Sequence, residues 1–145
     1  MSTLDVADRL DIGELYARYC LTFDGGDLDA WTALFAPDGT FQIAGGVRLS
    51  GTDELADFAK QMYAGAPGIR HLVSNVSISA ADGGARGSAY VVALGTTDDG
   101  AYRILTLGQY DDAFAKGPAG WRFHARTFTP WAAMDNPGIP LIGGA

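Results

Sequence analysis

Apolar residues in the first part of the chain recur with the period of an α-helix. From Asp5 onward most of them lie three to five positions apart, along one side of a helix, and they are Val6, Leu10, Leu15, Tyr16, Tyr19, Cys20 and Phe23. Asp5 is suited to cap the first turn, and Gly25 and Gly26 are suited to end the last. We therefore expect a long first helix between these residues.

Two further helices and a short strand are predicted before residue 69. Asp27 can cap a second helix that a turn at residues 36–39 ends, and its apolar stripe consists of Leu28, Trp31, Leu34 and Phe35. Residues 40–43 are expected to form a short strand. A third helix should begin at about Thr52 and close at residues 65–68, and its inward side chains are Leu55, Phe58 and Met62.

The remainder of the chain has the pattern of strands. Four longer runs, at residues 69–79, 85–96, 101–114 and 121–131, are separated by turn clusters at residues 80–84, 97–100 and 116–120. This spacing is typical of antiparallel hairpins. Helices followed by hairpins predict an α+β fold, in one domain over residues 1–145. The tail at residues 132–145 is expected to be irregular and to lie across one end of the sheet.

Both faces of the strand at residues 85–96 are apolar. One face carries Tyr90, Val92 and Leu94, and the other carries Ala89, Val91 and Ala93. A sheet that helices cover on one side only should show polar residues on its other side. We therefore expect a second copy of the chain to cover the outer face, in a homodimer or a homotrimer.

Charge and composition restrict the partners and the compartment. Ten basic and seventeen acidic residues give a net charge of −7, so no basic stripe is present to bind nucleic acid. No apolar run approaches the roughly 20 residues that span a bilayer, and Asp5 and Asp8 stand where a signal peptide carries Lys or Arg. The single cysteine, Cys20, cannot form an internal disulfide. We expect a cytoplasmic protein that contacts neither nucleic acid nor membrane.

The motifs of cofactor and metal enzymes are missing. The two histidines are not at ligand spacing, and no cysteine cluster supports them. The sequence contains no phosphate-binding or dinucleotide-binding glycine loop and no Gly-x-Ser-x-Gly nucleophile motif. We therefore expect no metal and no cofactor, which leaves proton chemistry by side chains.

Asp24 and His71 are the candidate catalytic residues. Asp24 falls in the last turn of the first predicted helix, where the helix dipole disfavours a negative charge. His71 lies on the first long strand, on one face with Val73 and Asn75. A histidine held by a carboxylate is a base of fixed tautomer. The alternatives are a solvated loop acid and a hydrogen-bonded core histidine.

The chain resembles the SnoaL-like members of the nuclear transport factor 2-like superfamily from about Val6 to Trp131. The resemblance is carried by residues 12–19 (IGELYARY), 23–27 (FDGGD), 31–39 (WTALFAPDG), 70–72 (RHL) with Asn75, and 120–123 (GWRF). It implies a cone-shaped, curved antiparallel sheet wrapped around N-terminal helices, the fold also called cystatin-like. A pocket is expected at the wide end of this cone.

Within the superfamily the chain is most similar to the branch of scytalone dehydratase and hexachlorocyclohexane dehydrochlorinase. In that branch an aspartate that ends the first helix and a histidine on the first long strand form a catalytic pair, and Asp24 and His71 match them. The chain lacks the second histidine of the dehydratase. It has Phe41 where the dehydratase has a tyrosine, and Tyr19 where the dehydrochlorinase has a lysine.

The resemblance implies a cofactor-independent lyase or isomerase that acts on a small apolar cyclic molecule. His71 would remove a proton from the substrate, and Asp24 would orient the imidazole of His71. Tyr19 would hold or protonate an oxygen of the substrate. The expected substrate-binding residues are Tyr16, Phe41, Phe58, Met62 and Asn75. A non-catalytic ligand-binding module, a module like a dioxygenase small subunit, and a polyketide cyclase are the alternatives.

Two basic residues of the last strand stay outside this assignment. His124 is expected at the surface. Arg126 shares a face with Arg122 and His124 in a regular strand. The alternation alone lets this face point either to solvent or into the core.

Overall fold

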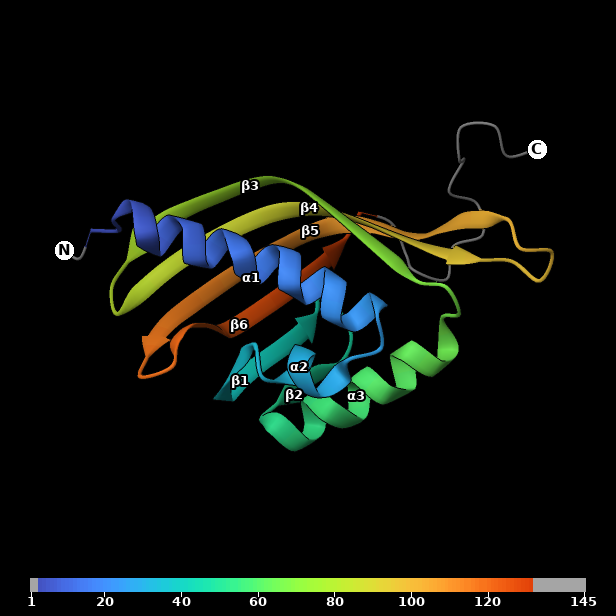
Figure 1. The fold of residues 1–145 in the computed structure, drawn as a ribbon, viewed down its shortest axis with the longest axis horizontal. Coiled ribbons are helices and arrows are strands. Elements are labelled where there is room, and N and C mark those ends of the chain that lie inside the picture. Colours follow the sequence, from blue (N-terminus) through green and yellow to red (C-terminus); the bar gives the residue numbers. More distant parts are fainter. Residues whose placement is uncertain (1–2, 132–145) are drawn as a thin grey trace.

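Three helices and six strands make up residues 3–131, the part of the chain that this computed structural model describes (Figure 1). Their order is α1 (Val6–Asp24), α2 (Leu28–Thr32), β1 (Phe35–Ile43), β2 (Arg48–Ser50), α3 (Thr52–Gly65), β3 (Arg70–Ala81), β4 (Gly84–Thr96), β5 (Tyr102–Gly117) and β6 (Gly120–Pro130). The helices precede the long hairpins, which confirms the predicted α+β class. The expectation for residues 132–145 lies outside the described residues.

The predicted first helix and its caps are confirmed. The Asp5 carboxylate accepts a hydrogen bond from the Asp8 backbone N–H at 2.7 Å, and the Asp8 carboxylate accepts one from the Asp5 N–H at 3.3 Å. These paired bonds form a capping box. Gly25 is the C-cap, and Gly26 follows with φ +79°. Val6 and Leu10 are exposed, so the buried stripe of α1 begins at Ile12.

One six-stranded sheet supports the helices, in the order β2-β1-β6-β5-β4-β3. Every neighbouring pair is antiparallel except β1 and β6, which run parallel. The sheet is curved, and α1 lies along its concave face, where it contacts β3 and β6 (Figure 1). The core fills the space between α1 and the sheet. The predicted antiparallel cone is confirmed, with one parallel pair inside it.

The boundary between α2 and β1 differs from the prediction. Leu34 and Phe35 were expected in the second helix, but α2 ends at Thr32 and Phe35 already belongs to β1. Phe35 lies beside Phe123 of β6, so strand pairing already includes Phe35, and the register shifts over residues 36–39 before pairing resumes at Thr40. The strand β2, with three residues, was not predicted, because it is too short to show an alternation.

Two β-bulges change the faces on which predicted residues lie. In β3 the register shifts between Ser74 and Ser77, and Asn75 has φ +57°. In β6 the extra residue is His124, because Phe114 pairs with Phe123 and Ala113 pairs with Ala125. A bulge inserts one residue and so reverses the alternation beyond it. Asn75 therefore does not share the inner face of His71, and Arg126 does not share the face of His124.

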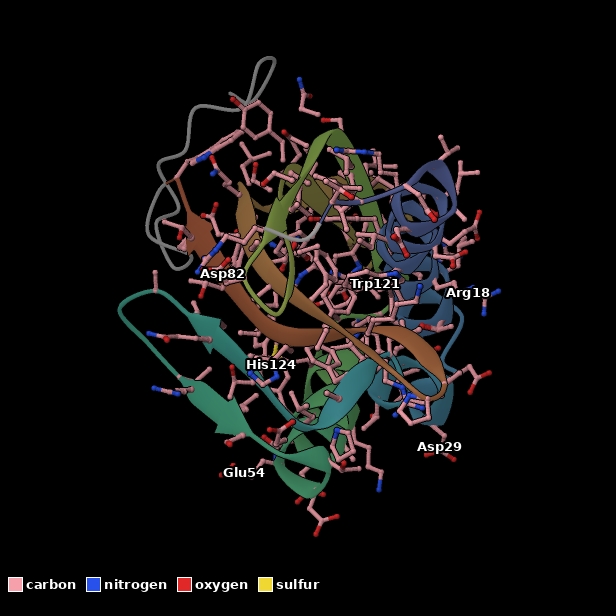
Figure 2. All side chains as sticks on the ribbon, turned by 90° about the vertical axis from the view of Figure 1, so that its left-hand side faces the viewer. Arg18, Asp29, Glu54, Asp82, Trp121 and His124 are labelled. Carbon is pink, nitrogen blue, oxygen red and sulfur yellow. The ribbon has the colours of Figure 1, made fainter. Side chains whose placement is uncertain are left out.

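The convex face of the sheet carries an apolar patch, as the sequence predicts for one face of β4, and polar residues such as Gln109 and Asp111 lie on the same face beside it. The side chains of Leu72, Tyr90, Tyr102 and Trp131 are exposed, and Val92 and Leu94 are half-buried beside them. On the other face Ala89, Val91 and Ala93 are buried. In contrast, polar side chains leave the helices toward solvent, as Figure 2 shows for Arg18, Asp29 and Glu54.

Candidate functional site

A cavity of about 120 Å³ lies between the C-terminal half of α1, α3 and the concave face of the sheet. Its wall is mostly aromatic and aliphatic, and it includes Phe23, Phe41, Phe58, Met62, Val91 and Phe128. The polar side chains in the wall are Tyr19, Trp31, His71, Thr106 and Tyr110. An apolar pocket with a few polar groups is the usual form of a small-molecule site.

The two candidate catalytic residues meet at this wall. The Nδ1 atom of His71 lies 2.6 Å from Oδ1 of Asp24, and the backbone N–H of His71 donates to Oδ2 of the same carboxylate at 2.7 Å. Both side chains are largely buried, with 12% and 10% of their surface exposed. Asp24 is the last residue of α1, and His71 is the second residue of β3. The helix end and the strand start therefore hold the pair in one geometry.

This geometry gives the imidazole a defined role. The carboxylate favours the tautomer in which Nδ1 carries the proton, which leaves Nε2 as the acceptor. The ring lies edge-on to Phe23 at 5.5 Å and to Tyr19 at 6.3 Å between centroids. Because His71 lines the cavity and Asp24 occupies Nδ1, Nε2 is the nitrogen available to a ligand. The carboxylate would also stabilise the imidazolium after proton uptake.

The other predicted site residues divide into two groups. Phe41, Phe58 and Met62 line the cavity together with Tyr19. Tyr16 does not, because it lies deeper in the core, where its hydroxyl donates to Oδ2 of Asp112 at 2.7 Å. Asn75 is exposed on the bulge of β3 and also lies outside the wall.

A buried ion pair that the sequence analysis did not predict lies beside the cavity. Arg126 donates through Nε to Oδ1 of Asp112 at 2.7 Å and through Nη2 to Oδ2 at 2.9 Å, and neither side chain is exposed. Its Nη1 is buried without a hydrogen-bond partner among the described residues. Asp112 and Arg126 are directly opposite in the β5–β6 register. The bulge at His124 brings Arg126 to the inner face of the sheet. Regular strand alternation had instead placed Arg126 on one face with Arg122 and His124.

The guanidinium of Arg126 is stacked among aromatic rings. Its Cζ lies 3.7 Å from the ring centroid of Tyr110 and 4.2 Å from that of Tyr19, both of which line the cavity. Burial raises the pKa of both tyrosines, and Arg126 acts in the opposite direction. The two phenols therefore remain protonated at neutral pH. Each can donate a hydrogen bond, and a positive charge lies behind them.

His124 lies at the surface, as expected. Half of its side chain is exposed, and its Nδ1 lies 3.8 Å from a carboxylate oxygen of Asp38 (labelled His124 in Figure 2). Within residues 3–131 no three His, Cys, Asp or Glu side chains gather as a metal site would require. The helices in this range are also too short or too polar to cross a membrane.

Comparison with known proteins gives a consistent picture. The family model described as SnoaL-like domain matches residues 5–127. An uncharacterised protein of Mycobacterium tuberculosis is 26% identical over 133 residues, which are 89% of each chain. A solved structure of another M. tuberculosis protein, of unknown function, is 31% identical with a TM-score of 0.78, over 86% of this chain and 72% of that chain.

The description of a third similar protein names its fold. This protein comes from Novosphingobium aromaticivorans and is described as nuclear transport factor 2-like with a cystatin-like fold. The two structures superpose with a TM-score of 0.82 at 24% identity, over 88% of this chain and 84% of the other. At this identity the similarity shows the fold alone.

Proposed function

The chain belongs to the family of SnoaL-like domains, and on this premise we propose that it is a cofactor-independent lyase or isomerase acting on a small, mostly apolar, cyclic molecule. The wider fold includes isomerases, dehydratases, cyclases and dioxygenase subunits, so membership alone leaves the chemistry open. The observation that carries the proposal is the bond between Asp24 and His71 at the wall of an apolar cavity. We place the chain nearest the branch of scytalone dehydratase and hexachlorocyclohexane dehydrochlorinase because Asp24 and His71 match the catalytic aspartate and histidine of that branch.

His71 is the base in the proposed reaction. Its Nε2 takes a proton from a carbon next to an activating carbonyl group, and Asp24 stabilises the resulting imidazolium. In an elimination, the electron pair of the broken C–H bond forms the new double bond. The hydroxyl group on the neighbouring carbon accepts the proton back from the imidazolium of His71 and leaves as water with the electron pair of its C–O bond, which restores the neutral base. In an isomerisation, the imidazolium returns the proton to a different carbon.

Tyr19 is proposed as the donor to the substrate oxygen. Its ring lies edge-on to His71, so both residues can contact one ligand. Burial keeps its hydroxyl protonated by raising the pKa, while Arg126 favours negative charge on the oxygen. A donor of this kind stabilises the charge that develops on a carbonyl oxygen during proton abstraction. Phe41, Phe58 and Met62 supply the apolar contacts.

The test is deuterium incorporation, which needs no knowledge of the natural substrate. Cyclohexanone in D₂O would be incubated with the protein, and NMR would follow exchange at the carbons next to the carbonyl. We expect exchange about 100-fold faster than in buffer, the lower end of a general-base contribution. His71→Gln should abolish the acceleration, Asp24→Asn should reduce it strongly, and His124→Gln should leave it unchanged.

Binding without exchange would contradict the catalytic proposal. If cyclohexanone binds to the cavity but its protons exchange at the buffer rate, the alternative of a non-catalytic ligand-binding module or subunit becomes the better account. Equal acceleration by the native chain and His71→Gln would also contradict it, because another group would then be the base.

We also propose that the chain forms a homodimer or homotrimer through the convex face of its sheet. The supporting observation is the row of apolar side chains left exposed there, including Leu72 and Tyr90. A large exposed apolar patch is typical of an interaction surface. The cytoplasm is the proposed compartment, since the thiol of Cys20 is buried and free.

A further inference from the structure

Three residues form one row across the inner face of the sheet. His71 of β3 is directly opposite Ala93 of β4, and Ala93 is directly opposite Thr106 of β5. Directly opposite residues point to the same face, and all three line the cavity. The row therefore joins the proposed base to a second polar side chain through one small residue.

The spacing of the row leaves room for a ligand. Adjacent strands lie about 4.8 Å apart, so the backbones of His71 and Thr106 are separated by roughly 10 Å. Ala93 lies between them, and its methyl group is the whole of the side chain at the centre of the row. A ligand that lies over Ala93 can therefore reach His71 at one side and Thr106 at the other.

A bulge in β5 gives Thr106 this position. Ala93 pairs with Thr106 and Leu94 with Ile104, so Leu105 is the extra residue. Leu105 and Thr106 both line the cavity, whereas consecutive residues of a regular strand point to opposite faces. The bulge thus adds a leucine to the wall without removing the threonine.

Among the described residues, Thr106 supplies an accessible polar group of the wall that neither another residue nor the proposed reaction uses. His71 is bonded to Asp24, and the phenols of Tyr19 and Tyr110 interact with each other and with Arg126. Trp31 Nε1 is unpaired but fully covered. Among the described residues Thr106 has no hydrogen-bond partner for its hydroxyl, and this oxygen is not among the fully covered atoms.

We propose that Thr106 is a polar subsite for the substrate, opposite the base. The substrate would be a single ring with a hydroxyl or carbonyl group on the side away from the carbon that His71 deprotonates. This assignment rests on the proposed function for the identity of the reacting end. The cavity of about 120 Å³ agrees with one ring, since an apolar core cavity of about 150 Å³ holds one benzene.

The test compares two probes of nearly equal shape, 4-hydroxycyclohexanone and 4-methylcyclohexanone. Their affinities would be measured by NMR titration for the native chain, Thr106→Val and Thr106→Ser. We expect the native chain to bind the hydroxy ketone about five- to tenfold more tightly than the methyl ketone, as one hydrogen bond provides. Thr106→Ser should keep this preference. Thr106→Val, which keeps the branched shape, should lose it.

The two proposals can fail separately. If Thr106→Val retains the preference, or if the native chain shows none or binds neither ketone, the subsite is wrong. Thermal melting of Thr106→Val would show that the variant is folded, and we expect a melting temperature no lower than that of the native chain. His71→Gln should keep the binding preference. If the native chain prefers the hydroxy ketone and Thr106→Val does not, but the native chain does not accelerate deuterium exchange, the subsite is supported and the catalytic role of His71 is contradicted.

Discussion

At the scale of single residues, the Asp112–Arg126 pair has the strongest energetic consequence. Removing one partner of a buried ion pair leaves the other charge without compensation and costs about 3–5 kcal/mol. Asp112 also accepts a hydrogen bond from the hydroxyl of Tyr16, so this carboxylate accepts three hydrogen bonds from two buried side chains.

We predict that Asp112→Asn lowers the free energy of unfolding by about 3–5 kcal/mol, measured by urea denaturation. The matched control is Asp111→Asn, because Asp111 is the preceding residue of β5 but is exposed. It should change stability by less than about 0.5 kcal/mol. Equal effects of the two substitutions would show that the buried charge of Arg126 is compensated by other groups.

The sequence predicted one of the two polar pairs in the core. Asp24 and His71 were selected from their positions in the predicted elements and were supported by the resemblance, and the structure brings them together. Asp112 and Arg126 were not assigned, because strand alternation places Arg126 with His124. A one-residue bulge reverses that placement. Bulges depend on how strands pair, so local patterns do not locate them. The same reason explains why Asn75 was placed in the cavity wall.

At the scale of elements, the start of α1 is tied to the β5–β6 hairpin. Oδ1 of Asp8 accepts hydrogen bonds from Nζ of Lys116 and from Nε1 of Trp121, each at 2.9 Å. These bonds lower the pKa of Asp8 from its ordinary 3.8 to about 2. Asp8 is also part of the capping box, so one carboxylate serves both the helix and its docking.

We predict that this tether makes stability depend on acid pH. Because the folded pKa is below the unfolded one, the stabilisation is fully present above about pH 4 and is lost as the pH falls toward about 2. Melting temperatures measured between pH 2 and 6 should therefore fall less steeply for Lys116→Gln than for the native chain. The control is Lys60→Gln, which removes the other lysine and should follow the native curve.

The elements were predicted with different success for physical reasons. The long hairpins and α1 were recovered because glycine-rich turns and caps mark their ends in the local sequence. The start of β1 was wrong because residues 36–39 have turn chemistry, while the residues on either side of them, Phe35 and Thr40, pair with β6 about 85 positions later. Tertiary pairing of this kind overrides local propensity.

At the scale of the whole molecule, the proposed association through the convex face of the sheet can be tested by mass. We predict that the native protein has the mass of a dimer or trimer in light scattering after gel filtration. Tyr90→Glu should shift it to the monomer, because a charge buried in an apolar interface is costly. The control Leu21→Glu changes an exposed leucine of α1 away from the sheet and should leave the mass unchanged. A native monomer would exclude the proposed interface.

The parallel pair of β1 and β6 has a consequence for how the chain folds during synthesis. Residues 40–43 lie beside residues 125–128, so the middle of the sheet is completed by a strand that is synthesised about 85 residues after its neighbour β1. Contacts of such long sequence separation slow folding. Until β6 is released, α1 and β1 have no completed sheet to cover, and their apolar faces are open to chaperones. Completion of the sheet is therefore a late step that follows synthesis of nearly all of residues 3–131.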